Sequence, residues 1–245
     1  MPRREQRVTL VRHTADPEAL TALGARLCYA GGDVDDLLRL VSEKEQRGFV
    51  EKIMAMGHES VMEHVSFTFL AEGVSRVLLA QLTRHRIASF SVQSQRYVSY
   101  AGGFGYIVPP AIASLGQEAV AEYEDQMAQM QAWYEAWQKR LGDAGESSNE
   151  DARFVLPNAC TTKIMMTMNA RSLMNFFHHR CCNRAQWEIR DLAEQMFKLC
   201  YAVAPNLFAN AGPACVAGAC PEGKMSCGKM LEMREKYSAL KDTKE

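Results

Sequence analysis

The sequence predicts a fold that mixes short β-strands with longer α-helices. Some stretches, such as residues 65–70, have the apolar and β-branched composition of strands. Others, such as residues 186–203, repeat apolar side chains with the period of an amphipathic helix. The chain has 245 residues, of which 47% are hydrophobic, so it can build a substantial core in one large domain or two small ones.

The first third of the chain is expected to contain two strands and three helices. Asp16 suits the N-cap of the first helix, and Pro17 suits its first position, where the missing N–H of proline is no loss. Gly57 suits the position after the second helix, which often has a left-handed backbone. The expected strands are residues 8–11 and 65–70, and the expected helices are residues 17–29, 33–56 and 75–83.

Helices are expected to dominate the rest of the chain. Residues 111–141 should form one long helix that can break near Gly116, and residues 142–149 should form a turn. The long helix carries a stripe that is expected to pack rather than bind, consisting of Tyr123, Met127, Met130, Tyr134 and Trp137. The other expected elements are strands at 95–99 and 164–168 and helices at 172–179, 186–203 and 230–240.

Charge and composition argue against several classes of function. The formal net charge of -1 argues against a general nucleic-acid-binding protein, which would need a basic surplus. No apolar run is as long as a membrane-spanning helix, and the N-terminus lacks the apolar region of a signal peptide. Eight cysteines without such a signal indicate free thiols in a reducing cytoplasm.

The segment from Arg84 to Tyr97, RHRIASFSVQSQRY, concentrates cationic and polar side chains. Guanidinium groups bind phosphate oxygens in pairs, and hydroxyl and amide groups fill the remaining acceptor directions. With Phe90 and Tyr97 as anchors, the segment predicts a site for a phosphate-bearing ligand; the alternative is a solvated positive turn. Its polar side chains are Arg84, His85, Arg86, Ser89, Ser91, Gln93, Ser94, Gln95 and Arg96.

The segment NARSLMNFFHHR, residues 169–180, predicts a helix with two different polar faces. Arg171 and Asn175 are four residues apart and share a face, and His178 lies on the same stripe. Arg180 is nine residues beyond Arg171, roughly half a circle away at about 3.6 residues per turn, so the two arginines should contact different ligands or different parts of one. The alternative is an ordinary amphipathic helix with a cationic C-terminal end. The buried side is expected to consist of Leu173, Phe176 and Phe177.

The histidines and cysteines are candidate metal ligands and nucleophiles. His58 and His64 do not have the spacing of an H-E-x-x-H zinc helix. Cys181 and Cys182 follow Arg180, which can lower a thiol pKa, so a nucleophilic role stays open. The sequence predicts no metal site, because no paired C-x-x-C spacing occurs among the tail cysteines Cys215, Cys220 and Cys227.

Four segments resemble blocks of the flavin-dependent thymidylate synthases. The signature of that family is Arg-His-Arg, seven residues, then Ser, and it is met by Arg84, His85, Arg86 and Ser94. The blocks GHESVMEH, EDARFVLP and NARSLMNFFHHRCCNRAQWEIR also resemble the family, in its order, so that the resemblance covers roughly residues 8–210.

The resemblance implies a fold and a reaction. The fold would be α/β, with a central, mostly antiparallel sheet and flanking long helices. Residues 1–210 would form a single domain, and the Cys- and Lys-rich extension 211–245 would pack on it. The enzyme would methylate dUMP to dTMP, with methylenetetrahydrofolate as carbon donor and FAD, reduced by NADPH, as hydride carrier. It would be a homotetramer with active sites between subunits.

The resemblance also assigns residues. Arg84 would lie near both ligands. Val92 departs from the family, where many relatives have Glu or Gln, and Arg184 stands where some have a His facing the flavin. The FAD-binding residues would be His58, Ser60, Arg84, His85, Arg86, Asn169, Arg171 and Asn175. The dUMP-binding residues would be Gln81, Arg84, Gln93, Ser94, Gln95, Arg96, Arg153 and Arg180.

The expected mechanism relies on Arg180. Uracil C5 is a poor nucleophile, and a guanidinium near N3 and its carbonyls would favour the electron-rich, deprotonated ring. This hypothesis needs no attacking thiolate, although Cys addition to C6 is the other known route. Ser94 has no visible triad partner, so its hydroxyl should donate to the dUMP phosphate rather than act as a nucleophile.

Two other functions remain open from the sequence. An RNA-binding module could use the basic segment and its aromatics, although the near-neutral charge argues against it. A flavoprotein oxidoreductase that has lost methyl transfer would oxidise NADPH without making dTMP, and Val92 leaves this open.

Overall fold

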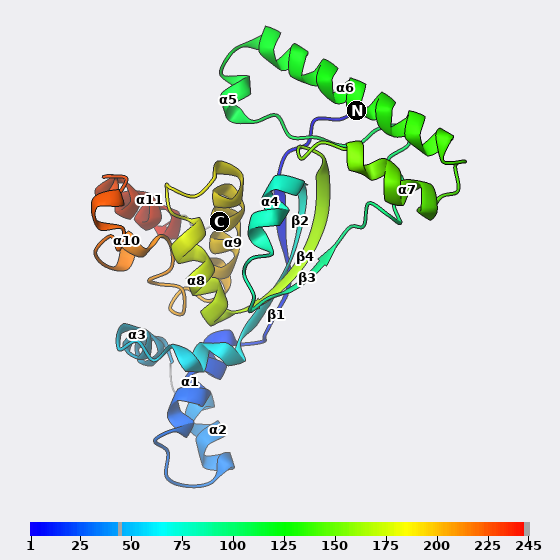
Figure 1. The fold of residues 1–245 in the computed structure, drawn as a ribbon. Helices are drawn as coiled ribbons and strands as arrows, with labels where there is room; N and C mark the ends of the chain where they lie inside the picture. The colour runs from blue at the N-terminus through cyan, green and yellow to red at the C-terminus, as the bar shows by residue number, and fades with distance from the viewer. Residues whose placement is uncertain (44–45, 243–245) are drawn as a thin grey trace. The chain divides into compact units, whose positions relative to one another are not determined.

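A computed structural model of the protein describes residues 1–43 and 46–242 (Figure 1). Its strands form one four-stranded sheet in the order β1-β2-β4-β3. The mixed class of helices and antiparallel sheet predicted above is confirmed. The strands are β1 (Arg7–His13), β2 (Ser66–Ser75), β3 (Ser89–Val92) and β4 (Thr161–Asn169).

Helices make up most of the remaining structure. The α-helices of the first half are α1 (Pro17–Leu27), α2 (Val34–Glu43), α3 (Arg47–Ala55), α4 (Arg76–Leu82), α5 (Pro110–Ala113) and α6 (Gln117–Arg140). Those of the second half are α7 (Glu146–Ala152), α8 (Ala170–Arg180), α9 (Trp187–Val203), α10 (Ala214–Ala217) and α11 (Met230–Asp242). Three short 3-10 helices complete the list: η1 (Glu59–His64), η2 (Arg153–Val155) and η3 (Gly223–Met225).

The chain groups into two compact units. Unit 1 comprises residues 1–7, 71–84 and 90–165, and unit 2 comprises residues 8–70, 85–89 and those from Met166 onward. The described part of the extension beyond residue 210 belongs to unit 2. The predicted division into residues 1–210 and 211–245 stays a prediction.

The core of unit 1 lies along α6. Met127 and Tyr134 point inward, as predicted for the helix stripe, whereas Trp137 is exposed. Two glutamines on the same side fix the neighbouring loop: Gln131 donates to the carbonyl of Tyr100 at 2.9 Å, and Gln138 donates to Asn149 Oδ1 at 2.6 Å. These buried amides are satisfied, so they orient the 94–104 loop instead of weakening the core.

The core of unit 2 is built from aromatic rings on several elements. Phe177 of α8 packs edge-on against Phe197 of α9, with ring centroids 5.9 Å apart, and against Phe208 at 6.0 Å. Phe197 in turn contacts Tyr237 of α11 at 5.1 Å. As predicted, Leu173, Phe176 and Phe177 form the buried side of α8.

Side-chain caps start the helices that carry the candidate site. Asn169 Oδ1 accepts the backbone N–H of Ser172 at 2.8 Å at the start of α8. Gln186 Oε1 accepts two N–H groups, from Glu188 and Ile189, at the start of α9. Such caps satisfy donors that have no partner within a helix and so define where each helix begins.

Several local predictions are confirmed. The helix expected at 111–141 breaks at Gly116, where φ is 106°, into α5 and α6. Gly57 follows α3 with φ of 75°. The single helix expected at 33–56 is not confirmed, because α2 and α3 are separate elements; residues 44–45 lie outside the described structure.

Other local predictions are wrong. The strand expected at 95–99 is a turn, because the Ser94 hydroxyl accepts the N–H groups of Arg96 and Tyr97; the strand lies earlier, at β3. The turn expected at 142–149 gives way to α7 from Glu146. Asp16 precedes α1 with a left-handed backbone (φ 44°) and makes no side-chain cap. Tyr97 does not anchor its loop, since it is 67% exposed.

Membrane-spanning helices and clusters of metal-ligating side chains are both absent from the described residues. Every helix within residues 1–43 and 46–242 is too short or too polar to cross a lipid bilayer. Across the same ranges, no three His, Cys, Asp or Glu side chains are grouped so that they could hold a metal ion.

The aromatic core of unit 2 gives a first prediction. Replacing Phe177 by Ala should lower the free energy of unfolding by about 3–5 kcal/mol, because the ring is fully buried and its loss leaves a cavity. The matched control, Phe154→Ala, removes a ring that is 83% exposed and should change it by less than about 0.5 kcal/mol. Urea denaturation measures both, and similar losses for the two variants would contradict this packing.

Candidate active site

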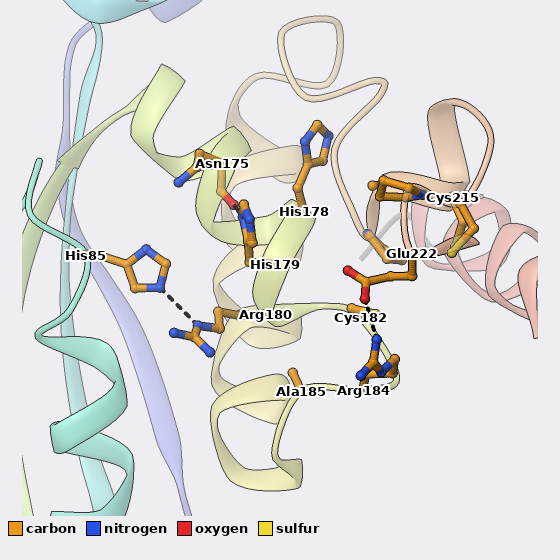
Figure 2. Close-up of a pocket in the computed structure, with 14 residues that line it drawn as sticks. His85, Asn175, His178, His179, Arg180, Cys182, Arg184, Ala185, Cys215 and Glu222 are labelled. Carbon is orange, nitrogen blue, oxygen red and sulfur yellow. Dashed lines mark hydrogen bonds and ion pairs between the residues drawn. The ribbon is translucent and has the colours of Figure 1, made fainter. Parts of the chain in front are cut away.

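Within unit 2, helix α8 and residues 85–89 of the basic segment bring together two residues that are predicted to bind different ligands. Arg180, at the end of α8, donates its Nε–H to His85 Nε2 at 3.0 Å, although 95 positions separate them. The His85 ring also packs edge-on against Phe176, one helical turn earlier, with centroids 4.9 Å apart. Figure 2 shows the two side chains facing each other at one side of a cavity.

This contact fixes the protonation state of His85. A guanidinium only donates hydrogen bonds, so Nε2 must be the unprotonated nitrogen, and the ring proton then lies on Nδ1. Burial, the largest cause, together with the charges of Arg180 and His179 lowers the pKa of His85 from 6.5 to about 4. His85 is therefore neutral at physiological pH and can offer an Nδ1–H donor.

A cavity of about 580 Å³ opens between α8 and the chain beyond residue 210. Its volume lies within the ~300–1,000 Å³ typical of small-molecule sites. Asn175 and Arg184 also line it, and Figure 2 shows Arg184 with Glu222 across from His85 and Arg180. Three predicted site residues thus meet here, namely His85, Asn175 and Arg180.

The GHESVMEH block meets the other face of α8. Arg171 forms an ion pair with Glu63 and a longer one, 3.6 Å, with Glu59. The hydrogen bond that Arg171 donates to Glu63 and the charges of both carboxylates raise the pKa of Arg171. His58 and Ser60 lie exposed on either side of Glu59 in the same block. Arg171 pairs with Glu63, whereas Arg180 donates to His85; their contact with different ligands stays a prediction.

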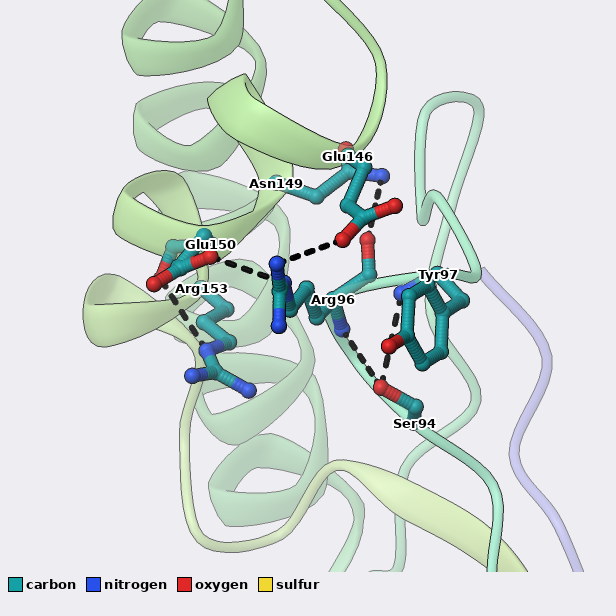
Figure 3. A network of polar contacts seen from close by, with 7 residues as sticks. All are labelled: Ser94, Arg96, Tyr97, Glu146, Asn149, Glu150 and Arg153. Carbon is teal, nitrogen blue, oxygen red and sulfur yellow. Dashed lines mark hydrogen bonds and ion pairs between the residues drawn. The ribbon is translucent and has the colours of Figure 1, made fainter.

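Part of the predicted dUMP set gathers in unit 1. Arg96 pairs with Glu146 at 2.6 Å and with Glu150 at 2.8 Å (Figure 3). Arg153 lies beside them and donates its Nε–H to the Glu150 carbonyl at 3.0 Å. The Ser94 oxygen accepts two backbone N–H groups, which leaves its own O–H as a possible donor to a ligand.

The remaining predicted residues occupy varied environments. Arg84 and Arg86 are exposed, and Gln81 and Gln93 are half-buried. Gln95 is buried, and its amide nitrogen lies 3.7 Å from the thiol of Cys160. Asn169 uses its side-chain oxygen as the helix cap described above.

The two cysteines considered as nucleophiles differ in accessibility. Cys181 is fully buried, and burial raises its pKa to about 12, so its reactive thiolate form is scarce at neutral pH. Cys182 is partly exposed and lines the cavity.

The sequence reasoning missed several polar residues of these sites. His179 lines the cavity and donates its Nδ1–H to the Asn175 carbonyl at 2.8 Å; its place in the HHR run was a usable signal. Glu146 pairs with Arg96, but its segment was expected to be a turn. Glu222 lies in the extension, where no motif pointed to a role.

The cavity residues fit a flavin nucleotide. His178 Nε2 is enclosed without a hydrogen-bond partner among the described residues, and its pKa is lowered, chiefly by burial. A neutral imidazole with an unsatisfied nitrogen requires a ligand atom or water to complete it. Arg180, His85 and Asn175 add the donors that phosphate and carbonyl oxygens accept.

The chain is similar to known proteins over most of its length. The chain matches the family model described as thymidylate synthase complementing protein over residues 9–206. A flavin-dependent thymidylate synthase from Geobacter sulfurreducens is 50% identical over 237 residues, covering 96% of this chain and 99% of that protein. One from Clostridium tetani is 49% identical over 241 residues, covering 94% and 96%.

A solved structure is also similar. It is the crystal structure of the UMP/dUMP methylase PolB from Streptomyces cacaoi bound with 5-Br dUMP, with a TM-score of 0.70 and 26% identity. The match covers 86% of this chain and 97% of that one. The fold and these matches define an enzyme of mixed helices and antiparallel sheet. More narrowly, the chain belongs to the flavin-dependent thymidylate synthase family, as the sequence motifs predicted.

The His85–Arg180 contact gives a second prediction. The pKa of His85 should be about 4 in the wild-type protein. In Arg180→Gln it should rise, because a neighbouring positive charge no longer opposes the imidazolium, yet stay below 6.5, because burial is the larger cause. NMR titration of the histidine ring resonances measures this value, with His85→Asn to assign the signal.

Arg184→Gln is the matched control. It removes another cavity arginine that does not contact His85, so the pKa of His85 should be unchanged. A wild-type value near 6.5, or a decrease in Arg180→Gln, would contradict the geometry.

Proposed function

We propose that the protein is a flavin-dependent thymidylate synthase that converts dUMP to dTMP. The observation that carries the proposal is the hydrogen bond between Arg180 and His85, which joins the family's Arg-His-Arg block to its NARSLMNFFHHR block at the edge of a nucleotide-sized cavity. Family membership over nearly the whole chain and the fold shared with a dUMP methylase support the same reaction.

FAD is the cofactor, and we place it against unit 2. His85 and Asn175 of the cavity would contact it, together with Asn169 and Arg171 at the start of α8. When bound, the flavin supplies hydride transfer, which no protein side chain can perform. The remaining FAD contacts are proposed for His58, Ser60, Arg84 and Arg86.

The dUMP phosphate is proposed to bind the polar network of unit 1. The Ser94 hydroxyl would donate to a phosphate oxygen, and Arg96 and Arg153 would supply charge. Arg96 already has two carboxylate partners, so a phosphate would share or replace one of them. Further contacts are proposed for Gln81, Arg84, Gln93 and Gln95.

Arg180 is proposed to activate the pyrimidine. One of its N–H groups is directed to His85, which holds the guanidinium in place. The fixed cation would stabilise negative charge on the uracil ring and make C5 more nucleophilic, as an oriented charge in a partly dry cavity does. A thiolate nucleophile is not needed, and the raised pKa of buried Cys181 supports that conclusion.

The other partners are proposed from the family. Methylenetetrahydrofolate would supply the one-carbon unit and NADPH the reducing equivalents. We propose a homotetramer with sites shared between subunits; the exposed Arg84 and Arg86 are in a position to meet a neighbouring chain. A cytoplasmic location is proposed because all eight cysteines are free thiols.

Turnover of Arg180→Gln tests the central assignment. Anaerobic incubation with reduced FAD, dUMP and methylenetetrahydrofolate should yield dTMP with the wild-type protein. Arg180→Gln should be slower by about 10²–10³-fold, the cost of losing one preorganised electrostatic donor. Wild-type protein that oxidises NADPH without forming dTMP would instead indicate an oxidoreductase, and RNA binding without flavin would indicate a binding module.

The matched controls are Cys181→Ala and Cys182→Ser, which remove the adjacent thiols. Both should keep turnover within about tenfold of wild type, because neither thiol is proposed to attack the ring. Loss of turnover in either variant, with dUMP and FAD still bound, would favour covalent catalysis.

Subunit mixing tests the shared site. Arg84→Ala and Arg180→Ala should each be inactive alone, whereas mixed oligomers should recover a measurable fraction of turnover if the two residues serve one site from different chains. Mixtures as inactive as their parents would place both residues in one protomer's site.

A further inference from the structure

The chain beyond residue 210 lines the candidate cofactor cavity. This part of unit 2 contains none of the family's sequence blocks quoted above. Figure 2 nevertheless shows Cys215 and Glu222 on the side of the cavity opposite His85 and Arg180. Both ends of a short segment, residues 213–215 and 220–222, line the cavity. The lining residues of this segment are Pro213, Ala214, Cys215, Cys220, Pro221 and Glu222.

One ion pair closes this wall against the rest of unit 2. Glu222 accepts a hydrogen bond from Arg184, which lies between α8 and α9. The α8–α9 connection is itself well fixed, since Arg190 donates to the carbonyl of Asn183 at 3.0 Å and Gln186 caps α9. The backbone that carries Arg184 is therefore held in place, and the Arg184 side chain forms the ion pair with Glu222.

The base of the same segment is held by α11. Arg234 donates to the carbonyls of Cys215 at 2.9 Å and Gly218 at 2.8 Å. Tyr237 is fully buried and lies directly against Gly212, where φ is 129° and an added Cβ would come within 2.7 Å of the ring. Residues near 212–218 are thus fixed by packing, while the end at Glu222 is held on the cavity side by the ion pair.

We propose that residues 213–222 form a wall of the flavin site and that the Arg184–Glu222 ion pair is the latch that holds this wall against the bound cofactor. The inference rests on the proposed function for the identity of the ligand. The pair is half-exposed, with side chains 41% and 45% accessible, so it contributes little to global stability. Its loss should loosen the wall without unfolding the protein.

Glu222→Gln tests the latch, with Glu232→Gln as the matched control. Glu232 pairs with Lys229 at 3.3 Å in the same part of the chain but does not line the cavity. In Glu222→Gln, amide hydrogen exchange within residues 213–222 should become faster. The dissociation constant for FAD, measured by flavin fluorescence, should rise about fivefold, the factor that corresponds to the ~1 kcal/mol upper range of exposed ion pairs. Glu232→Gln should match wild type in both measurements.

The charge-swapped variant Arg184→Glu/Glu222→Arg separates the latch from the individual side chains. It restores an ion pair between the same two positions, so exchange and FAD affinity should return towards wild type. Three results would overturn the proposal: FAD affinity unchanged in Glu222→Gln, an equal effect of Glu232→Gln, or a swapped variant that binds FAD no better than Glu222→Gln.

Failure of this inference can be told apart from failure of the proposed function. Wild-type protein that binds no FAD would overturn the proposed function, and the wall assignment with it. Wild-type protein that binds FAD as tightly as Glu222→Gln does would overturn the wall alone.

Discussion

The candidate site depends on one hydrogen bond between a cation that can only donate and an imidazole that must therefore accept. Arg180 ends a helix whose other face is fixed in the aromatic core, and His85 leads out of α4 into the basic segment. Because burial and the neighbouring charge both disfavour a second proton on His85, the two groups can stand together without repulsion. The same contact fixes the tautomer of the ring and the direction of the guanidinium.

Charge compensation is the second general feature of the protein. The arginines proposed to meet anionic ligands are already paired with carboxylates: Arg171 with Glu59 and Glu63, and Arg96 with Glu146 and Glu150. These pairs are half-exposed and individually weak, so a phosphate can compete with them. The formal net charge of -1 is thus compatible with binding several anions, because the cations are held locally instead of forming a general basic surface.

The sequence predicted the parts of the fold and site that depend on local pattern. Periodicity identified the buried side of α8, and Gly116 marked the break before α6. It failed where a side chain overrides propensity: the Ser94 hydroxyl turns the backbone of residues 95–97 out of a strand. The sequence pattern also could not place Glu222 beside Arg184, because that contact forms only when the extension packs on the rest of unit 2.

The position of Tyr237 ties the aromatic core of unit 2 to the segment that lines the cavity. Its ring completes the aromatic cluster around Phe197 and also lies directly against Gly212, just before that segment. A side chain at residue 212 would displace the ring, because an added Cβ would come within 2.7 Å of it. A change at this one glycine would therefore disturb the aromatic cluster and the lining of the cavity together, so the two parts of the protein cannot vary independently.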